Sequence, residues 1–290
     1  MEAATWSWAG FLVLTFLAGA VLYWLLVISE GTFLGASVVA LMYNWVARRY
    51  DSLKQFDADC EELFLRQPML RELRDRPNAW VLDVATGTGR VPWVLSLPGG
   101  FGGRIVGLDS SREMLCVAAE KDWASAERRP LFIWQNAMVL PFADERFDLV
   151  SSLEAMEFMP RPEQVLEEMV RVTRSGGALV LTRRRGWAAR LMLGKGWSKE
   201  RLLAELFRLG LESSRVVRWQ MDYDLVWARK PERTKGGIDL DPKAELMASI
   251  FCPKCREVVL VPEVGGLHCD GCHRRYRVAT DGVVELARPV

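Results

Sequence analysis

The feature that most constrains this chain is a glycine-bearing turn at residues 81–90, with the sequence VLDVATGTGR. An apolar run leads into it, as a buried strand of a parallel sheet would. Gly87 and Gly89 allow a tight turn and let the backbone approach a ligand where a side chain would collide. A second apolar run ends on Asp109, where folds of this kind hold two ribose hydroxyls. Strand, glycine turn, helix, strand and terminal acid, in this order, predict a nucleoside-cofactor site.

The surroundings of this turn narrow the kind of cofactor. A dinucleotide site would carry a third glycine and a phosphate loop would read GxxxxGK[ST], and neither pattern occurs here. The chain instead resembles class I S-adenosylmethionine (SAM)-dependent methyltransferases over roughly residues 45–230. Within this class, the nearest resemblance is to enzymes that methylate quinone precursors and similar small molecules. Four blocks carry the resemblance: VLDVATGTGR at 81–90, GLDSSREML at 107–115, QNAMVLPF at 135–142 and FDLVSS at 147–152.

The resemblance implies an α/β fold, in which a Rossmann-like sheet of seven strands occupies residues 48–230. It implies a helix at 163–173 and antiparallel sixth and seventh strands at 216–219 and 222–229. It also assigns SAM binding to ten residues: Asp83, Ala85, Thr86, Gly87, Gly89, Asp109, Ser110, Met114, Asn136 and Ala137.

Three of these residues either depart from the family pattern or have an alternative role. Asn136 stands where the family usually has an aspartate, so the adenine amino group would meet an acceptor without charge. For Asp83 and Asp109 the alternative role is local, in helix capping or turn chemistry. The ordered blocks around them favour the cofactor role.

The first 47 residues have the composition of a membrane anchor, because Glu2 and Glu30 are their only charges. Residues 8–28 are uncharged and long enough to cross a bilayer as one helix. Residues 33–47 form a second apolar run, which predicts a short second span, an interfacial helix or the first helix of the methyltransferase domain. The alternative for the first run is a core helix of a fully soluble protein.

The charges that follow the apolar region predict the orientation of this anchor. Arg48, Arg49 and Lys54 come directly after it, and cationic residues beside a span favour the cytoplasmic side. With one transmembrane helix or two, the catalytic domain therefore faces the cytoplasm. SAM is made in that compartment.

The end of the chain carries a second strong signal, a pair of Cys-x-x-Cys motifs separated by 13 residues. This spacing suits a tetrahedral Zn²⁺ site with four thiolate ligands. Short runs at 258–261 and 276–278 predict strands, so residues 250–290 are expected to form a small β-rich zinc ribbon after a linker at 231–249. A disulfide pairing would need an oxidising compartment. The four expected ligands are Cys252, Cys255, Cys269 and Cys272.

The role of this ribbon has two interpretations. Its last segment, RYRVATDGVVEL, resembles small zinc-ribbon proteins that dock onto certain methyltransferases and stabilise them. A structural role is therefore favoured. Clustered arginines keep RNA recognition as the alternative.

The catalytic residues are constrained by the positions of the two histidines. Both lie in the ribbon, so the methyltransferase region has no histidine to act as a general base. Glu154 and Glu157 follow the fourth strand, where the family places methyl transfer, and either could remove a proton or orient the acceptor. The alternative for both is helix capping or solvent exposure. Because methyl transfer from a sulfonium is an in-line displacement, alignment and exclusion of water can supply much of the rate.

The segment RRRGWAARLMLGKGW at residues 183–197 bears on the substrate. It carries five cations, two tryptophans and no acid, a pattern typical of an interfacial segment drawn to anionic lipid. The alternative is a solvated basic loop.

Taken together, these features predict a membrane-anchored SAM-dependent methyltransferase that acts on a lipid-soluble small molecule, such as a quinone precursor or a lipid. The net charge of +1 argues against a strongly steered nucleic-acid partner. The alternatives are an RNA or protein methyltransferase that docks its substrate through the ribbon, and a non-catalytic SAM-binding scaffold.

Overall fold

The structure, a computed structural model, describes residues 2–76, 78–99, 101–123, 129–232 and 249–289. Its strands are β1 (Trp80–Val84), β2 (Arg104–Asp109), β3 (Leu131–Trp134), β4 (Phe147–Ser152), β5 (Thr173–Arg184), β6 (Glu212–Arg218), β7 (Tyr223–Arg229), β8 (Val261–Glu263), β9 (Gly266–His268), β10 (Arg275–Val278) and β11 (Val284–Glu285). Its helices are α1 (Glu2–Tyr23), η1 (Trp24–Ile28), α2 (Ala36–Lys54), α3 (Ala58–Glu61), η2 (Glu62–Arg66), α4 (Gln67–Glu72), α5 (Arg90–Ser96), α6 (Arg112–Glu120), η4 (Met156–Phe158), α7 (Pro162–Val172), α8 (Gly186–Leu191) and α9 (Lys199–Arg208).

Among the described residues, one sheet runs through the whole domain in the order β6-β7-β5-β4-β1-β2-β3-β11-β10-β9-β8. Neighbours from β3 to β5 are parallel, and β7 pairs antiparallel with both β5 and β6. The Rossmann-like sheet expected from the sequence is therefore present, including its antiparallel last two strands. Because β1 lies between β2 and β4, the carboxyl ends of these three strands meet at one edge, where ligands bind in open α/β sheets.

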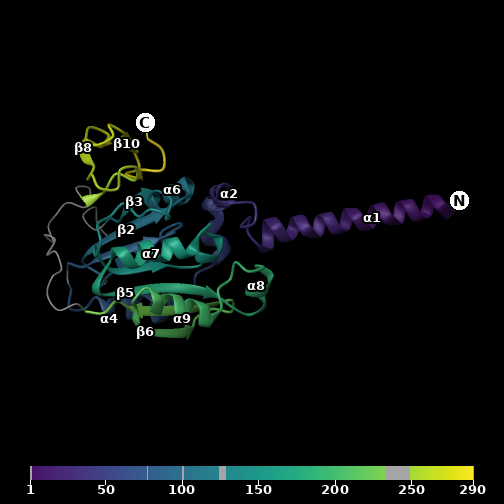
Figure 1. The fold of residues 1–290 in the computed structure, drawn as a ribbon, viewed down its shortest axis with the longest axis horizontal. Coiled ribbons are helices and arrows are strands. Elements are labelled where there is room, and N and C mark those ends of the chain that lie inside the picture. The colour runs from purple at the N-terminus through teal and green to yellow at the C-terminus, as the bar shows by residue number, and fades with distance from the viewer. Residues whose placement is uncertain (1, 77, 100, 124–128, 233–248, 290) are drawn as a thin grey trace.

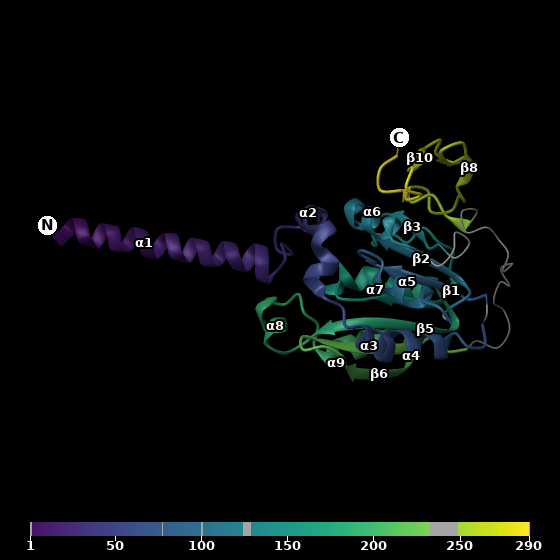
Figure 2. The same cartoon turned by 180° about the vertical axis from the view of Figure 1, so that it is seen from behind.

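Helices cover both faces of the sheet, which explains why β1 is buried along its entire length (Figures 1 and 2). Leu82 and Val84 pack on one face with apolar residues of β2, β4 and α7. Val81 packs on the other face with residues of η2, α4 and α5. A strand that is apolar on both sides is what a parallel sheet between two helical layers requires. The glycine turn after Val84 is thus held by a rigid core.

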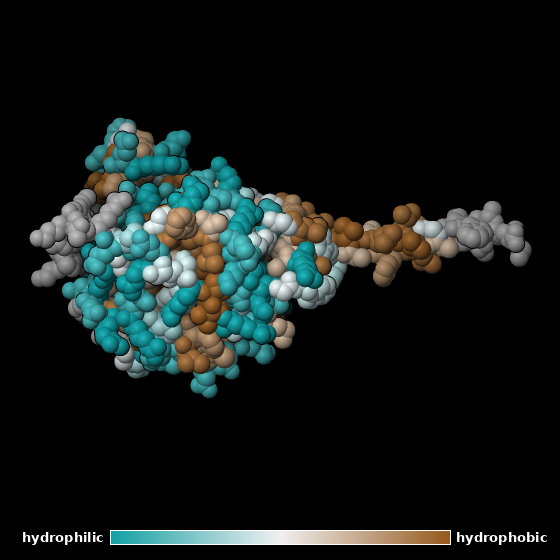
Figure 3. All heavy atoms as spheres, turned by 60° about the horizontal axis from the view of Figure 1, so that its bottom comes forward, coloured by the Kyte–Doolittle hydropathy of each residue, from teal (hydrophilic) through white to brown (hydrophobic). Residues whose placement is uncertain are grey.

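The N-terminal helix α1 projects away from the domain, and the π-helical turn η1 at its end connects it to the domain (Figures 1 and 2). The stretch Trp8–Ile28 has a mean hydropathy of 2.5, and none of it is buried. Figure 3 shows this hydrophobic surface continuing along the projecting helix. Within the described part of the chain, it is the one helix long and apolar enough to cross a membrane.

The second apolar run follows a different course. It forms most of α2, which lies on the catalytic domain and packs against α6. Ala47 is buried there, and Asn44 accepts a hydrogen bond from the Ser111 hydroxyl. Of the three structures considered for residues 33–47, this packing corresponds to the first helix of the domain. One side of α2 faces α6 and the cavity, so only its other side is free to contact lipid.

The C-terminal module extends the central sheet instead of standing apart from it. β11 pairs in parallel with β3, with Val284 opposite Ile133 and Glu285 opposite Trp134. Its first strand begins at Val261, later than the sequence indicated, and before it Val259 forms only an isolated antiparallel bridge with Phe251. Apart from residues 231, 232 and 249, the expected linker at 231–249 lies outside the described residues.

Candidate active site

The glycine turn connects β1 to α5 through three residues with positive φ. Ala85 has φ of 57°, Gly87 of 55° and Gly89 of 80°. A Cβ added at Gly87 would meet no atom within 4 Å, so the backbone there borders open space. A Cβ at Gly89 would lie 3.3 Å from that of Ala118, in the packing between α5 and α6. Gly87 therefore keeps the backbone accessible to a ligand, whereas Gly89 allows the helix to pack closely.

Asp109, at the end of β2, lies opposite this turn. Its two carboxylate oxygens accept hydrogen bonds from the amides of Gly87, at 2.8 Å, and Ser111, at 2.7 Å. Burial raises the pKa of Asp109, and these amide hydrogen bonds counteract the shift. Each oxygen keeps a lone pair free, so the carboxylate can still accept hydrogen bonds from a ligand's hydroxyls.

Asp83, near the end of β1, makes its hydrogen bonds inside the protein. Its oxygens accept hydrogen bonds from the hydroxyls of Thr86 and Ser151, both at 2.7 Å, and the side chain is buried. Burial raises the pKa of Asp83 to about 7. These contacts support a role in fixing the turn.

The carboxyl ends of β1, β2 and β4 border a cavity of about 310 Å³, at the lower end of the roughly 300–1,000 Å³ typical of small-molecule sites. Six of the ten residues assigned to SAM line it: Ala85, Gly87, Asp109, Ser110, Asn136 and Ala137. The other four, Asp83, Thr86, Gly89 and Met114, lie behind this surface. Met114, for example, is 1% exposed, because it packs in the core under α6.

One wall of the cavity comes from the far end of the chain. Trp134 lines the cavity, and its indole N–H donates to the carbonyl of Ser110. The carbonyl of Trp134 accepts hydrogen bonds from the amides of Leu286, at 3.0 Å, and Ala287, at 2.9 Å. Ala287 itself also lines the cavity. The C-terminal module thus contributes directly to the pocket.

The side of the cavity beyond the glycine turn is largely apolar. It is lined by residues of α2 and of the segment after β4, among them Val39, Ala40, Tyr43, Tyr50, Leu153, Phe158 and Met159. Burial raises the pKa values of Tyr43 and Tyr50. Neither phenol is therefore a ready proton acceptor near neutral pH.

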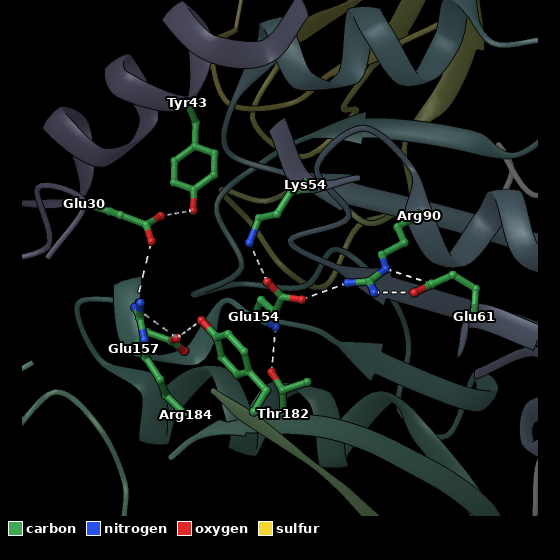
Figure 4. Close-up of polar contacts among 10 residues, drawn as sticks. Glu30, Tyr43, Lys54, Glu61, Arg90, Glu154, Glu157, Thr182 and Arg184 are labelled. Atoms are coloured by element: carbon green, nitrogen blue, oxygen red, sulfur yellow. Dashed lines mark hydrogen bonds and ion pairs between the residues drawn. The ribbon is translucent and has the colours of Figure 1, made fainter. Parts of the chain in front are cut away.

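Glu154 reaches this side of the cavity and is held by two cations (Figure 4). Lys54 contacts one carboxylate oxygen at 2.6 Å, and Arg90 contacts the other at 2.8 Å. Burial alone would raise the pKa of Glu154, but the two cations outweigh it and lower the pKa. Arg90 also pairs with Glu61. An ionised, doubly paired carboxylate is a weak base and a good electrostatic anchor.

Glu157 does not line the main cavity. It is 3% exposed and accepts a hydrogen bond of 2.6 Å from the hydroxyl of Tyr223 (Figure 4). Burial raises its pKa, although Arg184 lies 3.8 Å away. The short helix η4 directs this side chain toward β5 and β7, away from Glu154. The two glutamates proposed for catalysis are therefore separated, and of the two only Glu154 borders the main cavity.

Several lining or supporting residues were missed by the sequence analysis: Tyr43, Asn44, Tyr50, Arg90, Trp134 and Ala287. Arg90 directly follows the glycine turn, so its position beside the site could have been anticipated. The contribution of α2 depends on its packing against α6, and no local pattern shows this. Asn136 uses its side-chain oxygen to accept the amide of Met138, as in an Asx turn.

The four cysteines of the C-terminal module converge on one point. Their sulfur atoms all lie within 4.8 Å of one another, with separations of 3.7 Å between Cys252 and Cys272 and 3.9 Å between Cys255 and Cys269. A tetrahedral Zn²⁺ site with Zn–S bonds of ~2.3 Å places its sulfurs about 3.8 Å apart. The donor set and spacing fit zinc.

Comparisons with known proteins bear on the fold and the enzyme class of this chain. Residues 82–181 match the family described as a methyltransferase domain. Demethylmenaquinone methyltransferases of Shouchella clausii and Bacillus mycoides are each 31% identical over 141 residues, which is 48% of this chain and 59% of the relative. The chain thus spans about three fifths of these relatives. The crystal structure of the [4+2]-cyclase SpnF superposes with a TM-score of 0.55 at 20% identity, covering 69% of this chain and 97% of SpnF, which shows a shared fold.

Proposed function

We propose that this chain, which matches a methyltransferase domain over residues 82–181, transfers a methyl group from SAM to a lipid-soluble small molecule, such as a quinone precursor, at the cytoplasmic face of a membrane. The observation that carries this proposal is the two-part cavity. One part presents the backbone of Gly87 and the carboxylate of Asp109, and the other is walled by apolar residues of α2 and of the segment after β4. The relatives named above support a quinone as the acceptor.

In this proposal, Asp109 binds the ribose hydroxyls through its free lone pairs, and Gly87 lets the cofactor approach the turn. Trp134 and Asn136 border the adenine. SAM would supply a methyl group bound to a positively charged sulfur, and the neutral thioether that remains is a good leaving group. The protein has to align the acceptor and exclude water, and α2 is placed over the cavity to do both.

The residues around the acceptor side limit its chemistry. Glu154 is ionised and paired with Lys54 and Arg90, so it orients groups better than it removes protons. Among the described lining residues there is no histidine. We therefore expect an acceptor that ionises on its own, such as a phenol or an activated ring carbon.

The membrane placement rests on α1. Its exposed apolar surface has the length of a bilayer span, and the cationic residues after the apolar region favour the cytoplasm for the domain. Anchoring would hold the cavity where lipophilic acceptors are concentrated. For the C-terminal module, we propose that Cys252, Cys255, Cys269 and Cys272 bind a structural Zn²⁺.

Incubating the purified full-length chain with methyl-labelled SAM and native membranes tests the reaction. Label should enter the solvent-extractable lipid fraction of membranes, and it should not enter RNA or protein. Asp109→Asn should reduce SAM affinity about 10- to 100-fold, because hydrogen bonds to a charged acceptor are lost. Asp144→Asn is the matched control, since that carboxylate is exposed and pairs with Arg171 outside the cavity.

Two outcomes would replace the proposal. Label in RNA or protein would favour substrate docking through the ribbon, which presents Arg275 and Arg277 at its surface. SAM binding without transfer to any fraction would favour a non-catalytic scaffold. The pairing of Glu154 and the removal of Glu157 from the cavity are the observations that keep this scaffold as the second candidate.

A further inference from the structure

Beside the base of α1 lies a surface, here called the α8 surface, formed by the exposed residues Trp187, Arg190 and Leu193 and the half-buried Lys195. Trp187 is 71% exposed and Leu193 is 67% exposed, although both are large and apolar. Exposed apolar side chains of this size usually mark a contact with another surface. The proposed reaction does not require any of the four.

One hydrogen bond joins the end of α8 to the membrane anchor. The indole N–H of Trp24 donates to the carbonyl of Leu191 at 3.0 Å, so η1 is joined to the end of α8. Trp24 also stacks on Phe33, with ring centroids 4.9 Å apart. Figures 1 and 2 both show α8 on the side of the domain from which α1 projects. The α8 surface therefore lies near the level where the apolar stretch Trp8–Ile28 ends.

The structure divides the five cations of residues 183–197 into two groups. Arg183 and Arg185 pair with Asp224. Arg184 lies between Glu30 and Glu157 (Figure 4). These three arginines are therefore ion-paired within the protein. Arg190 and Lys195 have no ion-pair partner among the described residues. No acidic residue occurs in residues 183–197 to neutralise them.

Cations and large apolar side chains together, without acids, match the chemistry of an anionic lipid surface. The cations attract the phosphate headgroups, and tryptophan and leucine enter the boundary between headgroups and acyl chains. Resting on the proposed anchoring, we propose that the α8 surface binds the anionic leaflet next to α1 and gives the domain a second point of contact with the membrane.

Two points of contact with the membrane would restrict the orientation of the domain more than the anchor helix alone does. The first turns of α2, which come soon after the anchor, contribute four residues to the cavity lining: Ala36, Ser37, Val39 and Ala40. Docking of the α8 surface holds this wall toward the bilayer. A lipophilic acceptor can then pass from the leaflet into the cavity along α2 without crossing open water.

Hydrogen–deuterium exchange of the full-length protein in nanodiscs tests this proposal. Nanodiscs that contain phosphatidylglycerol should protect the amides of residues 186–194, whereas pure phosphatidylcholine nanodiscs should leave them exchanging freely. Arg190→Glu with Lys195→Glu should reduce the protection about 20-fold or more, because each cation near an anionic surface contributes a factor of about five. The matched control is Arg104→Glu with Arg277→Glu, which has the same charge change at exposed sites on β2 and β10.

The amides of α1 provide an internal reference in the same measurement. Their protection in both lipids reports the anchor, independently of the α8 surface and of any methyl transfer. Exchange of residues 186–194 that is equally fast in both lipids would overturn the proposal. Equal protection in both lipids would also overturn it, because charge would then not select the leaflet.

Discussion

Replacing Arg112 by alanine should weaken SAM binding, although its side chain does not line the cavity. Arg112 begins α6, directly after Ser110 and Ser111, and pairs with two carboxylates of the C-terminal module. Its guanidinium contacts Asp281 at 3.0 Å and Glu285 at 2.8 Å. These pairs hold β11 beside β3 and so position the wall made by Trp134 and Ala287.

The magnitude follows from the exposure of the pairs. The side chain of Arg112 is 18% exposed, and those of Asp281 and Glu285 are 23% and 19% exposed. Such pairs lie between surface pairs, worth up to ~1 kcal/mol, and buried pairs, whose disruption costs ~3–5 kcal/mol. We therefore expect the variant to lose about 1–2 kcal/mol of the free energy that holds the cavity wall in its binding position. If all of this loss appears in the binding of SAM, the Kd for SAM rises roughly 5- to 30-fold.

Calorimetric titration of SAM into the full-length variants measures this effect. Arg208→Ala is the matched control. It removes an arginine of α9 that pairs at the surface with Glu167 of α7 and with Glu205 of α9. Combining Arg112→Ala with Glu285→Gln should give less than the sum of the single effects. An unchanged Kd together with faster amide exchange in β11 would refute the coupling between module and cavity.

Three further predictions follow from the same structure. Cys252→Ser should lower the bound zinc measured by elemental analysis and destabilise the module in a thermal melt, and full zinc retention would contradict the four-thiolate site. Asp83→Asn should remove a pH dependence of stability. The pKa of Asp83 is raised on folding to about 7, so the folded state holds the proton more tightly, and its contribution to stability falls as pH rises from ~4 to ~7. Denaturation at several pH values checks this, and an unchanged slope would contradict the buried position. Glu154→Gln should lower the transfer rate without changing the pH profile between about pH 6 and 9, because the lowered pKa keeps Glu154 ionised there. If instead the wild-type rate fell toward low pH and Glu154→Gln abolished this acidic limb, Glu154 would be a base.

The parts of the site that were predicted from sequence depend on local chain geometry. Gly87 follows a buried strand by three residues, and Asp109 ends the next strand, so topology alone brings them to the same sheet edge. The four cysteines likewise lie in two short turns, and their spacing predicts that the four sulfur atoms lie close together. In each case the residues that meet belong to elements with a characteristic connection.

The parts that were not predicted depend on contacts between distant elements. The pairing of β11 with β3 joins residues about 150 positions apart, and a two-residue strand such as Val284–Glu285 has no periodicity to detect. The apolar run of α2 is equally compatible with lipid and with a protein surface. Its packing against α6 depends on contacts that no local pattern shows, such as that of Asn44 with Ser111. The exclusion of Glu157 from the cavity likewise depends on the direction of a single short helix, η4.

The most direct test of the central claim is to identify the methylated product. The full-length protein is incubated with native membranes and SAM that carries a heavy methyl group, and lipid extracts are analysed by mass spectrometry. The account predicts a lipophilic product that gains one heavy methyl group with the wild-type chain and with Asp144→Asn, and much less of it with Asp109→Asn. A heavy methyl group found only on RNA or protein, or equal product from Asp109→Asn, would contradict it.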